Sequence, residues 1–106
     1  MNRILQISYN ELLYDRKAAE RRINTYCREH RGCIVTGATS YNDTLLVMIE
    51  SRNDGVAPNY VIADAEAESH ETLISSIRSR YDAGFSTITT FTAADTLWGL
   101  YARVEN

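Results

Sequence analysis

The sequence repeats a short pattern at a fixed spacing. Asp43-Thr44-Leu45 recurs 52 residues later as Asp95-Thr96-Leu97, and Gly32 and Gly84 precede the two copies at the same offset. Each glycine follows a helical pattern and precedes a run that is typical of a β-strand. A period of about half the chain indicates two copies of one supersecondary unit, because self-similarity at a fixed spacing is the mark of a repeated architecture.

The first half is predicted to have the order β-α-β-β. A short strand at residues 4–9 precedes a helical pattern that ends at Arg31. Gly32 then suits the left-handed conformation in which many helices end. Two strands follow at 33–39 and 44–51, and the polar turn residues 40–43 separate them.

The start of the helix is set by comparison with the second half. Asn10 and Asp15 are both favoured N-cap residues and would begin helices of different length. Alignment of Ile23 with Ile77 places Asp15 opposite Ser69, which is itself a good N-cap. We therefore expect the main helix to begin at Asp15, with the residues before it forming a helical turn or a loop.

The second half repeats the same order of elements. A strand at 60–63 precedes a helix from Ser69 to about Ala83, and a second pair of strands follows at 85–92 and 96–104. The stretch 52–59 contains the only proline and is the natural linker. The chain is thus predicted to be a single domain, 1–106, with internal repeats at about 3–52 and 59–104.

The predicted fold class is α+β, with tandem duplicated β-α-β-β units that form one mainly antiparallel sheet with two helices packed on one face. The 106 residues, of which 44% are hydrophobic, can build one modest core but not two, so the repeats are expected to share it. The order of elements is similar to that of families built from a duplicated β-α-β-β module, such as the GyrI-like small-molecule-binding proteins. This resemblance lies in the order of elements and assigns no functional residue.

Strand alternation predicts a second apolar sheet face. Leu45, Val47 and Ile49 point to one side of their strand, and the residues between them point to the other. If the helices cover the first side, the opposite side is an open apolar face, and such faces usually mark an interface or a ligand groove. The favoured interpretation is a homodimer, and the alternatives are a sheet curled enough to bury both faces or a ligand cavity. The predicted face consists of Leu46, Met48, Trp98 and Leu100.

Charge is unevenly distributed along the chain. The net charge is −3, yet residues 16–31 hold six basic side chains against two acidic ones. Guanidinium groups bind carboxylate or phosphate bidentately, so an anionic ligand would find clamps here. The acidic total disfavours general affinity for nucleic acid. The candidate clamps are Arg21, Arg22, Arg28 and Arg103.

Cysteine and histidine suggest no catalytic or metal centre. Cys27, His30 and Cys33 offer three ligands where zinc takes four, and His70 is far away in sequence. A thiol nucleophile beside Arg28 or Arg31 is conceivable, but inert packing is the expected state. We therefore predict no metal, no cofactor and no catalytic residue.

The sequence therefore predicts a non-enzymatic binding or interaction module, homodimeric, that engages a small ligand or a partner protein. The arginines suit that ligand if it is anionic. The alternatives are a small enzyme with an intersubunit active site and a nucleic-acid-binding protein that uses the basic first helix. No membrane partner is expected, since no apolar run approaches the roughly 20 residues that span a bilayer. Two cysteines and the lack of a signal-peptide pattern favour the cytoplasm.

Overall fold

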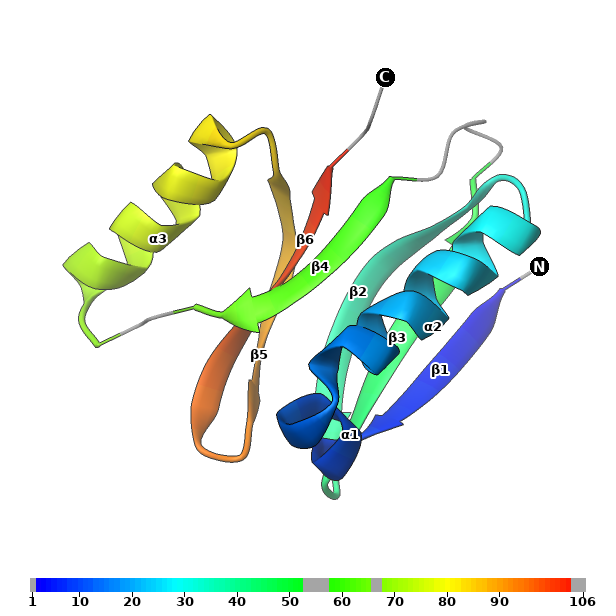
Figure 1. Cartoon of the computed structure of the whole chain (residues 1–106), viewed down its shortest axis with the longest axis horizontal. Helices are drawn as coiled ribbons and strands as arrows, with labels where there is room; N and C mark the ends of the chain where they lie inside the picture. Colours follow the sequence, from blue (N-terminus) through cyan, green and yellow to red (C-terminus); the bar gives the residue numbers. More distant parts are fainter. Residues whose placement is uncertain (1, 53–57, 66–67, 104–106) are drawn as a thin grey trace.

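The computed structural model describes residues 2–52, 58–65 and 68–103. It has an α+β fold, with helices and strands mixed along the chain (Figure 1). None of the helices in these residues is both long and apolar enough to cross a membrane. The elements are β1 (Arg3–Ser8), α1 (Tyr9–Tyr14), α2 (Arg16–Glu29), β2 (Cys33–Tyr41), β3 (Thr44–Ser51), β4 (Asn59–Asp64), α3 (His70–Asp82), β5 (Ser86–Ala93) and β6 (Thr96–Arg103).

The helix ends follow local sequence chemistry. The Asp15 carboxylate accepts a hydrogen bond from the Ala18 N–H and begins α2, which confirms Asp15 as the N-cap of the main helix. The residues before it form the short helix α1. Ser69 caps α3 and forms a capping box with Thr72, as its residue type predicts.

The strands form two antiparallel sheets instead of the single sheet predicted. The first sheet has the order β1-β3-β2 and the second has the order β4-β6-β5. Each hairpin turns at two residues with positive φ, at 42–43 and at 94–95. A two-residue turn with this conformation matches the right-handed twist of the strands that it connects. Each sheet also has a β-bulge, in β2 between Val35 and Gly37 and in β5 between Thr87 and Thr89.

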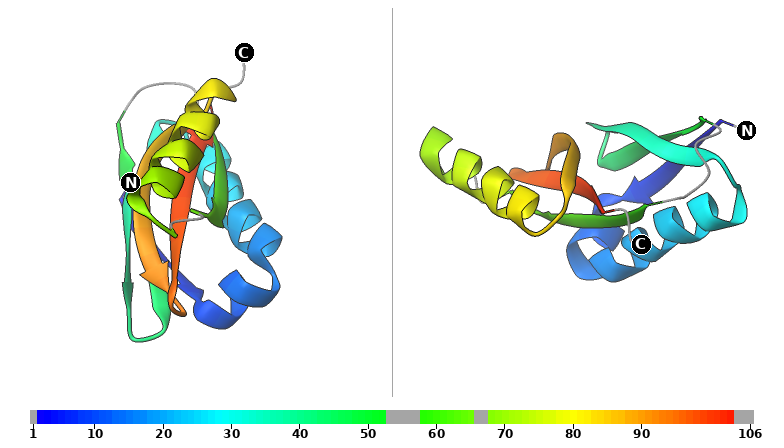
Figure 2. Two further views of the ribbon diagram at one scale, coloured as in Figure 1. Left: turned by 90° about the vertical axis from the view of Figure 1, so that its left-hand side faces the viewer. Right: turned by 90° about the horizontal axis from the view of Figure 1, so that it is seen from above.

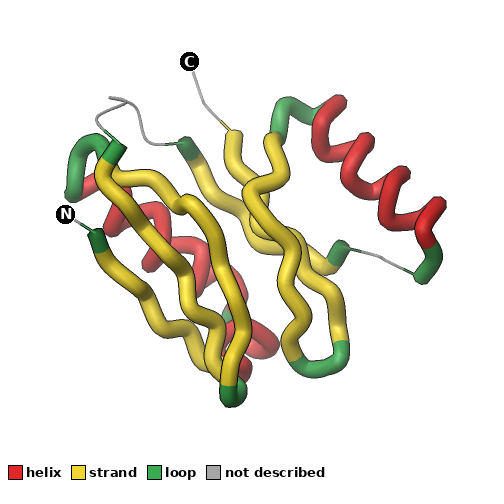
Figure 3. The backbone as a smooth tube through the Cα atoms, turned by 180° about the vertical axis from the view of Figure 1, so that it is seen from behind, coloured by secondary structure: helices red, strands yellow, loops and turns green. Residues whose placement is uncertain are grey.

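The two sheets meet along β2 and β5, as the view from behind shows (Figure 3). The Ser40 hydroxyl donates a hydrogen bond to the Thr92 carbonyl oxygen at 2.6 Å. Farther along β2, the Val35 N–H donates to the Tyr60 hydroxyl oxygen at 2.9 Å. The first bond links the facing edges of β2 and β5, and the second links β2 to β4, without a continuous ladder between the sheets.

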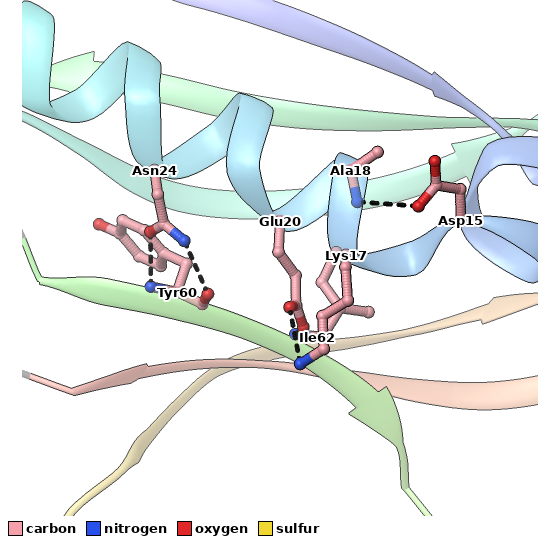
Figure 4. A network of polar contacts seen from close by, with 7 residues as sticks. All are labelled: Asp15, Lys17, Ala18, Glu20, Asn24, Tyr60 and Ile62. Carbon is pink, nitrogen blue, oxygen red and sulfur yellow. Dashed lines mark hydrogen bonds and ion pairs between the residues drawn. The ribbon is translucent and has the colours of Figure 1, made fainter.

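A polar contact also joins α2 to β4 (Figure 4). The Tyr60 N–H donates to Asn24 Oδ1 at 2.7 Å, and Asn24 Nδ2 donates to the Tyr60 carbonyl at 3.1 Å. The Ile62 N–H donates to Glu20 Oε2 at 2.8 Å, while the other oxygen of Glu20 lies 3.4 Å from Lys17 Nζ. Side chains of α2 thus take the place of a neighbouring strand at this edge of the second sheet.

The helices do not cover one common face, which differs from the prediction. α2 lies over the first sheet, whereas α3 stands on the far side of the second sheet, away from α2 (Figure 2). No residue of α3 is buried, and Ile74 and Tyr81 are 53% and 58% exposed. The core instead fills the space between α2, the first sheet and the near face of the second sheet. Its large, fully buried members include Ile7, Leu12, Ile23, Leu45, Ile49, Tyr60, Ile62 and Leu100.

Alkaline pH is expected to destabilise this core. Burial raises the pKa of the Cys27 thiol from 9.0 to about 11, and the neighbouring Cys33 adds to the rise. Burial likewise raises the pKa of the Tyr60 phenol from 10.0 to about 12. Because the folded state holds both protons more tightly than the unfolded chain does, this stability is complete below pH 9 and is lost as the pH rises toward these values.

Urea unfolding followed between pH 7 and pH 12 measures this effect. We expect a fall of about 1–3 kcal/mol for each group over its range. Cys27→Ala should flatten the fall that begins near pH 9, whatever its effect at neutral pH. A slope identical to that of the wild type would contradict the assignment to Cys27.

Candidate anion-binding groove

A groove lies between β1 and α2, at the outer edge of the first sheet. Arg3 and Leu5 face α2 because alternate residues of a strand share one face. The hollow has a volume of about 530 Å³. It is lined by Arg3, Leu5, Ala18, Arg21, Arg22, Thr25, Tyr26 and Glu29.

The helical period explains why α2 presents these residues together. Its buried stripe includes Ala19, Ile23 and Cys27, which pack into the core. Residues 18, 21, 22, 25 and 29 recur at spacings of three and four and form the flank beside β1. Glu20 and Asn24 form the opposite flank, which contacts β4. The basic flank is therefore the one that the second half of the chain leaves uncovered.

Tyr26 forms a buried wall of the groove and is 8% exposed. Its ring stacks on His30, with 4.0 Å between the ring centroids, and the Arg3 guanidinium lies 5.1 Å from the Tyr26 centroid. The Tyr26 hydroxyl is buried without a hydrogen-bond partner in the part of the chain that the structure describes. An unsatisfied buried hydroxyl is costly, so this oxygen is a point of unmet hydrogen-bonding capacity behind the groove wall.

The groove carries excess positive charge. Arg22 pairs with Glu11 at 2.6 Å and donates to the Gln6 carbonyl at 3.0 Å. Across residues 2–52, 58–65 and 68–103, no ion pair is formed by Arg3 or Arg21. Glu29 is the one acidic side chain in the lining. The site is thus locally basic although the whole chain has a net charge of −3.

The predicted arginines divide between two places. Arg21 lines the groove, and Arg28 lies beside it, where its Nη2 donates to Thr25 Oγ1 at 3.3 Å. Arg103 ends β6 in the other half, with its guanidinium 5.8 Å from the Phe85 ring centroid. Arg103 does not line the groove, because the groove is formed by β1 and α2 and Arg103 lies at the end of β6.

The expected open apolar face is divided in the structure. Trp98 is 8% exposed and Leu100 is fully buried, whereas Leu46 and Met48 are only partly buried. The second sheet turns the face that bears Trp98 toward the core, and the Trp98 Nε1–H donates to the Ala93 carbonyl at 3.0 Å. The expectation of exposure is thus wrong for Trp98 and Leu100. Even-numbered residues of β6 face the core, whereas the even-numbered Leu46 and Met48 of β3 stay partly exposed.

The sequence prediction did not include Arg3, Tyr26 or Glu29 in the site. Arg3 stood outside the basic run at 16–31, and Tyr26 read as an ordinary core residue. The alternation of Arg3, Leu5 and Ile7 was the available signal, because it places Arg3 on the same face as two core residues and hence under the helix.

The remaining candidate chemistry is confined to single side chains. Cys27 and Cys33 are both buried, Cys33 Sγ lies 3.7 Å from Ser51 Oγ, and His30 Nδ1 lies 3.0 Å from the Tyr26 carbonyl oxygen. In the described part of the chain, no three His, Cys, Asp or Glu residues are grouped as metal ligands would be.

Comparison with known protein families, with curated proteins and with solved structures found no match to this chain.

Proposed function

We propose that this chain is a non-enzymatic binding module whose groove between β1 and α2 holds an anionic group, a carboxylate or a phosphate. The observation that supports this most is that two guanidinium groups, those of Arg3 and Arg21, line one groove and form no ion pair among the described residues. Arg3 and Arg21 flank Tyr26, whose hydroxyl has no partner in the described residues. Guanidinium groups bind such anions with two parallel hydrogen bonds.

The lining supports binding rather than catalysis. It contains no cysteine, histidine or serine, and Glu29 is its one carboxylate. Covalent catalysis needs a nucleophile held beside a general base, and acid–base catalysis needs a group positioned to transfer a proton. The nearby His30 stacks on Tyr26 and its Nδ1 contacts a backbone oxygen, so it is engaged in structure.

Reversal of one groove charge tests the proposal. Arg21→Glu is expected to weaken binding of inorganic phosphate at least about tenfold, because it removes a donor and adds a repulsive charge. Titration followed by backbone amide NMR shifts measures the affinity and locates the site. We expect saturable shifts at Thr25 and Tyr26.

Arg78→Glu is the matched control for this experiment. Arg78 is an exposed arginine on α3, on the far side of the second sheet. The same change of charge there should leave phosphate affinity unchanged. Equal weakening by both variants would point to general electrostatic attraction, and the absence of saturable shifts in the groove would contradict the proposal.

We also propose that the two halves are copies of one β-α-β-β unit. The strand order within each sheet is the same, with the third strand of the unit in the middle. Both bulges and both positive-φ turns recur at the 52-residue spacing of the sequence repeat. Coincidence of these two backbone features at one spacing supports duplication, and Gly32 and Gly84, both with positive φ, recur at the same spacing.

Self-association and a cytoplasmic location remain parts of the proposal. Ile4 is 58% exposed and pairs with Met48, and Leu46 lies on the same face two residues along. This smaller apolar strip supports a contact between copies, although Trp98 and Leu100 do not take part in it. The low content of two cysteines supports a reducing compartment. The mass measured by light scattering over a range of concentrations tests the self-association.

A further inference from the structure

The four edges of the two sheets are treated differently by the rest of the chain. β2 and β5 face one another, with the bond from Ser40 to Thr92 between them. The edge of β4 is bound by Glu20 and Asn24 from α2. Among the described residues, no strand or helix side chain covers the edge of β1 in this way, apart from the single bond from Arg22 to Gln6. β1 is therefore the edge that is available to another strand.

The hydrogen bonds of β1 show which backbone groups face outward. The Tyr9 N–H bonds to the Asp43 carbonyl, so the odd-numbered residues of this segment face β3. The Gln6 carbonyl is bound by Arg22 from outside the sheet, so Gln6 faces the open edge. Because hydrogen-bonding direction alternates along an antiparallel strand, the Ile4 N–H and C=O also face outward.

The two faces beside this edge differ in chemistry. On the α2 side lies the basic groove with Arg3 and Arg21. On the opposite side lies a second hollow of about 400 Å³, whose lining includes the apolar residues Ile4 and Met48 together with Glu50 and part of Arg3, which lines both hollows. A strand added beside β1 would project its side chains alternately toward these two surfaces.

We propose that the partner is an extended polypeptide segment that adds as a strand to β1. Its acidic side chains occupy alternate positions and face Arg3 and Arg21, and its apolar side chains occupy the positions between and face Ile4 and Met48. This inference rests on the proposed function, because it uses the same basic groove for the carboxylates. Backbone hydrogen bonds to Ile4 and Gln6 hold the segment, and the two grooves select its sequence.

Charge and shape favour such a segment over nucleic acid. The chain has a net charge of −3, and Glu29 and Glu50 lie in the two hollows beside the edge. A phosphate backbone carries negative charge on every residue and has no apolar side chains to meet Ile4 and Met48. An alternating peptide places charge on one side only, which is the side that bears the arginines.

Two peptides of equal composition test the alternation. Acetyl-(Glu-Val)₃-amide presents carboxylates and methyl groups on opposite sides of a strand, whereas acetyl-Glu₃-Val₃-amide does not. We expect the alternating peptide to bind at least about tenfold more tightly, as measured by amide NMR titration. Methylation of those peptide N–H groups that face β1 should abolish binding, because it removes the strand pairing and leaves the protein unaltered.

A protein variant separates the edge from the groove. Ile4→Pro removes an outward N–H that no described residue accepts, and proline is tolerated at such edge positions. This variant should lose the alternating peptide and keep inorganic phosphate. Arg21→Glu should weaken both ligands, and the Arg78→Glu control should weaken neither.

The outcomes distinguish the two claims. Phosphate binding in the groove with equal affinity for the two peptides, or with no effect of N-methylation, would overturn the strand addition and leave the groove in place. Absence of both phosphate and peptide binding would overturn the groove as well. Tighter, strongly salt-dependent binding of a single-stranded oligonucleotide would also overturn the assignment to a polypeptide.

Discussion

Replacement of Trp98 by alanine is expected to lower the free energy of unfolding by about 3–5 kcal/mol. Trp98 is 8% exposed in a single chain, and its indole N–H bonds to the Ala93 carbonyl. The variant therefore loses buried aromatic surface and leaves an internal cavity. Urea unfolding followed by far-ultraviolet circular dichroism measures the loss, since Trp98 is the only tryptophan and its fluorescence disappears with the side chain.

The control for this change is Leu46→Ala, in the strand β3. Leu46 is only partly buried, so its replacement should cost less than about 1 kcal/mol. Wild-type emission should already be blue-shifted at dilutions where the protein is a monomer. Destabilisation by Trp98→Ala that depends on protein concentration would show instead that Trp98 is covered by a second copy.

Asn24→Leu is expected to cost about 2–4 kcal/mol, because each of two buried backbone groups loses its partner. The Asn24 amide donates to the Tyr60 carbonyl and accepts from the Tyr60 N–H, and Tyr60 is fully buried. Leucine keeps a similar volume but offers neither bond. Urea unfolding gives the total loss, and hydrogen exchange at the Tyr60 amide reports the contact between α2 and β4 directly.

Thr25→Leu is the matched control for Asn24→Leu. Thr25 is the next residue of α2 and is exposed on the opposite flank. The change should leave the exchange rate of the Tyr60 amide as it is in the wild type. Equal loss of stability in the two variants would mean that helix propensity, and not the bond to Tyr60, sets the effect.

The local features of the fold were predictable from sequence. Asp15 and Ser69 cap helices because their side chains accept from the first backbone N–H groups. The turns at 42–43 and 94–95 lie where the Asp-Thr-Leu landmarks begin, and Gly32 and Gly84 have the positive φ expected past a helix end. Each of these depends on residues within one turn or hairpin.

The relation between the halves was not predictable in the same way. Strand alternation shows which residues share a face, but it does not show what covers that face. Trp98 and Met48 are both even-numbered residues in the middle strand of their sheet. Trp98 nevertheless packs in the core, while Met48 faces outward. The prediction that both helices pack on one sheet face likewise implied burial of α3, whereas Ile74 and Tyr81 are exposed. Both differences arise from the packing of one sheet against another, which involves residues far apart in sequence.

The candidate groove was predictable in part. The run of arginines along one helix indicated Arg21 and Arg28, because residues at helical spacing gather on a flank. Arg103 has the same chemistry but lies in the other half, and charge alone gives no position. Tyr26 gave no signal, since an unpartnered buried hydroxyl becomes visible only when every neighbour is placed.

The bulges determine how many sheets this chain has. Thr36 and Ile88 are the residues passed over in the two ladders, and they lie in the strands β2 and β5, whose edges face one another. A bulge bends its strand and increases the local twist, so two bulged edges cannot pair along their full length. The contact between β2 and β5 therefore lacks a continuous hydrogen-bond ladder, and the second sheet is free to turn relative to the first. The turned sheet presents the β4 edge to Asn24 of α2, so within the described residues β1 is the edge left for a further strand.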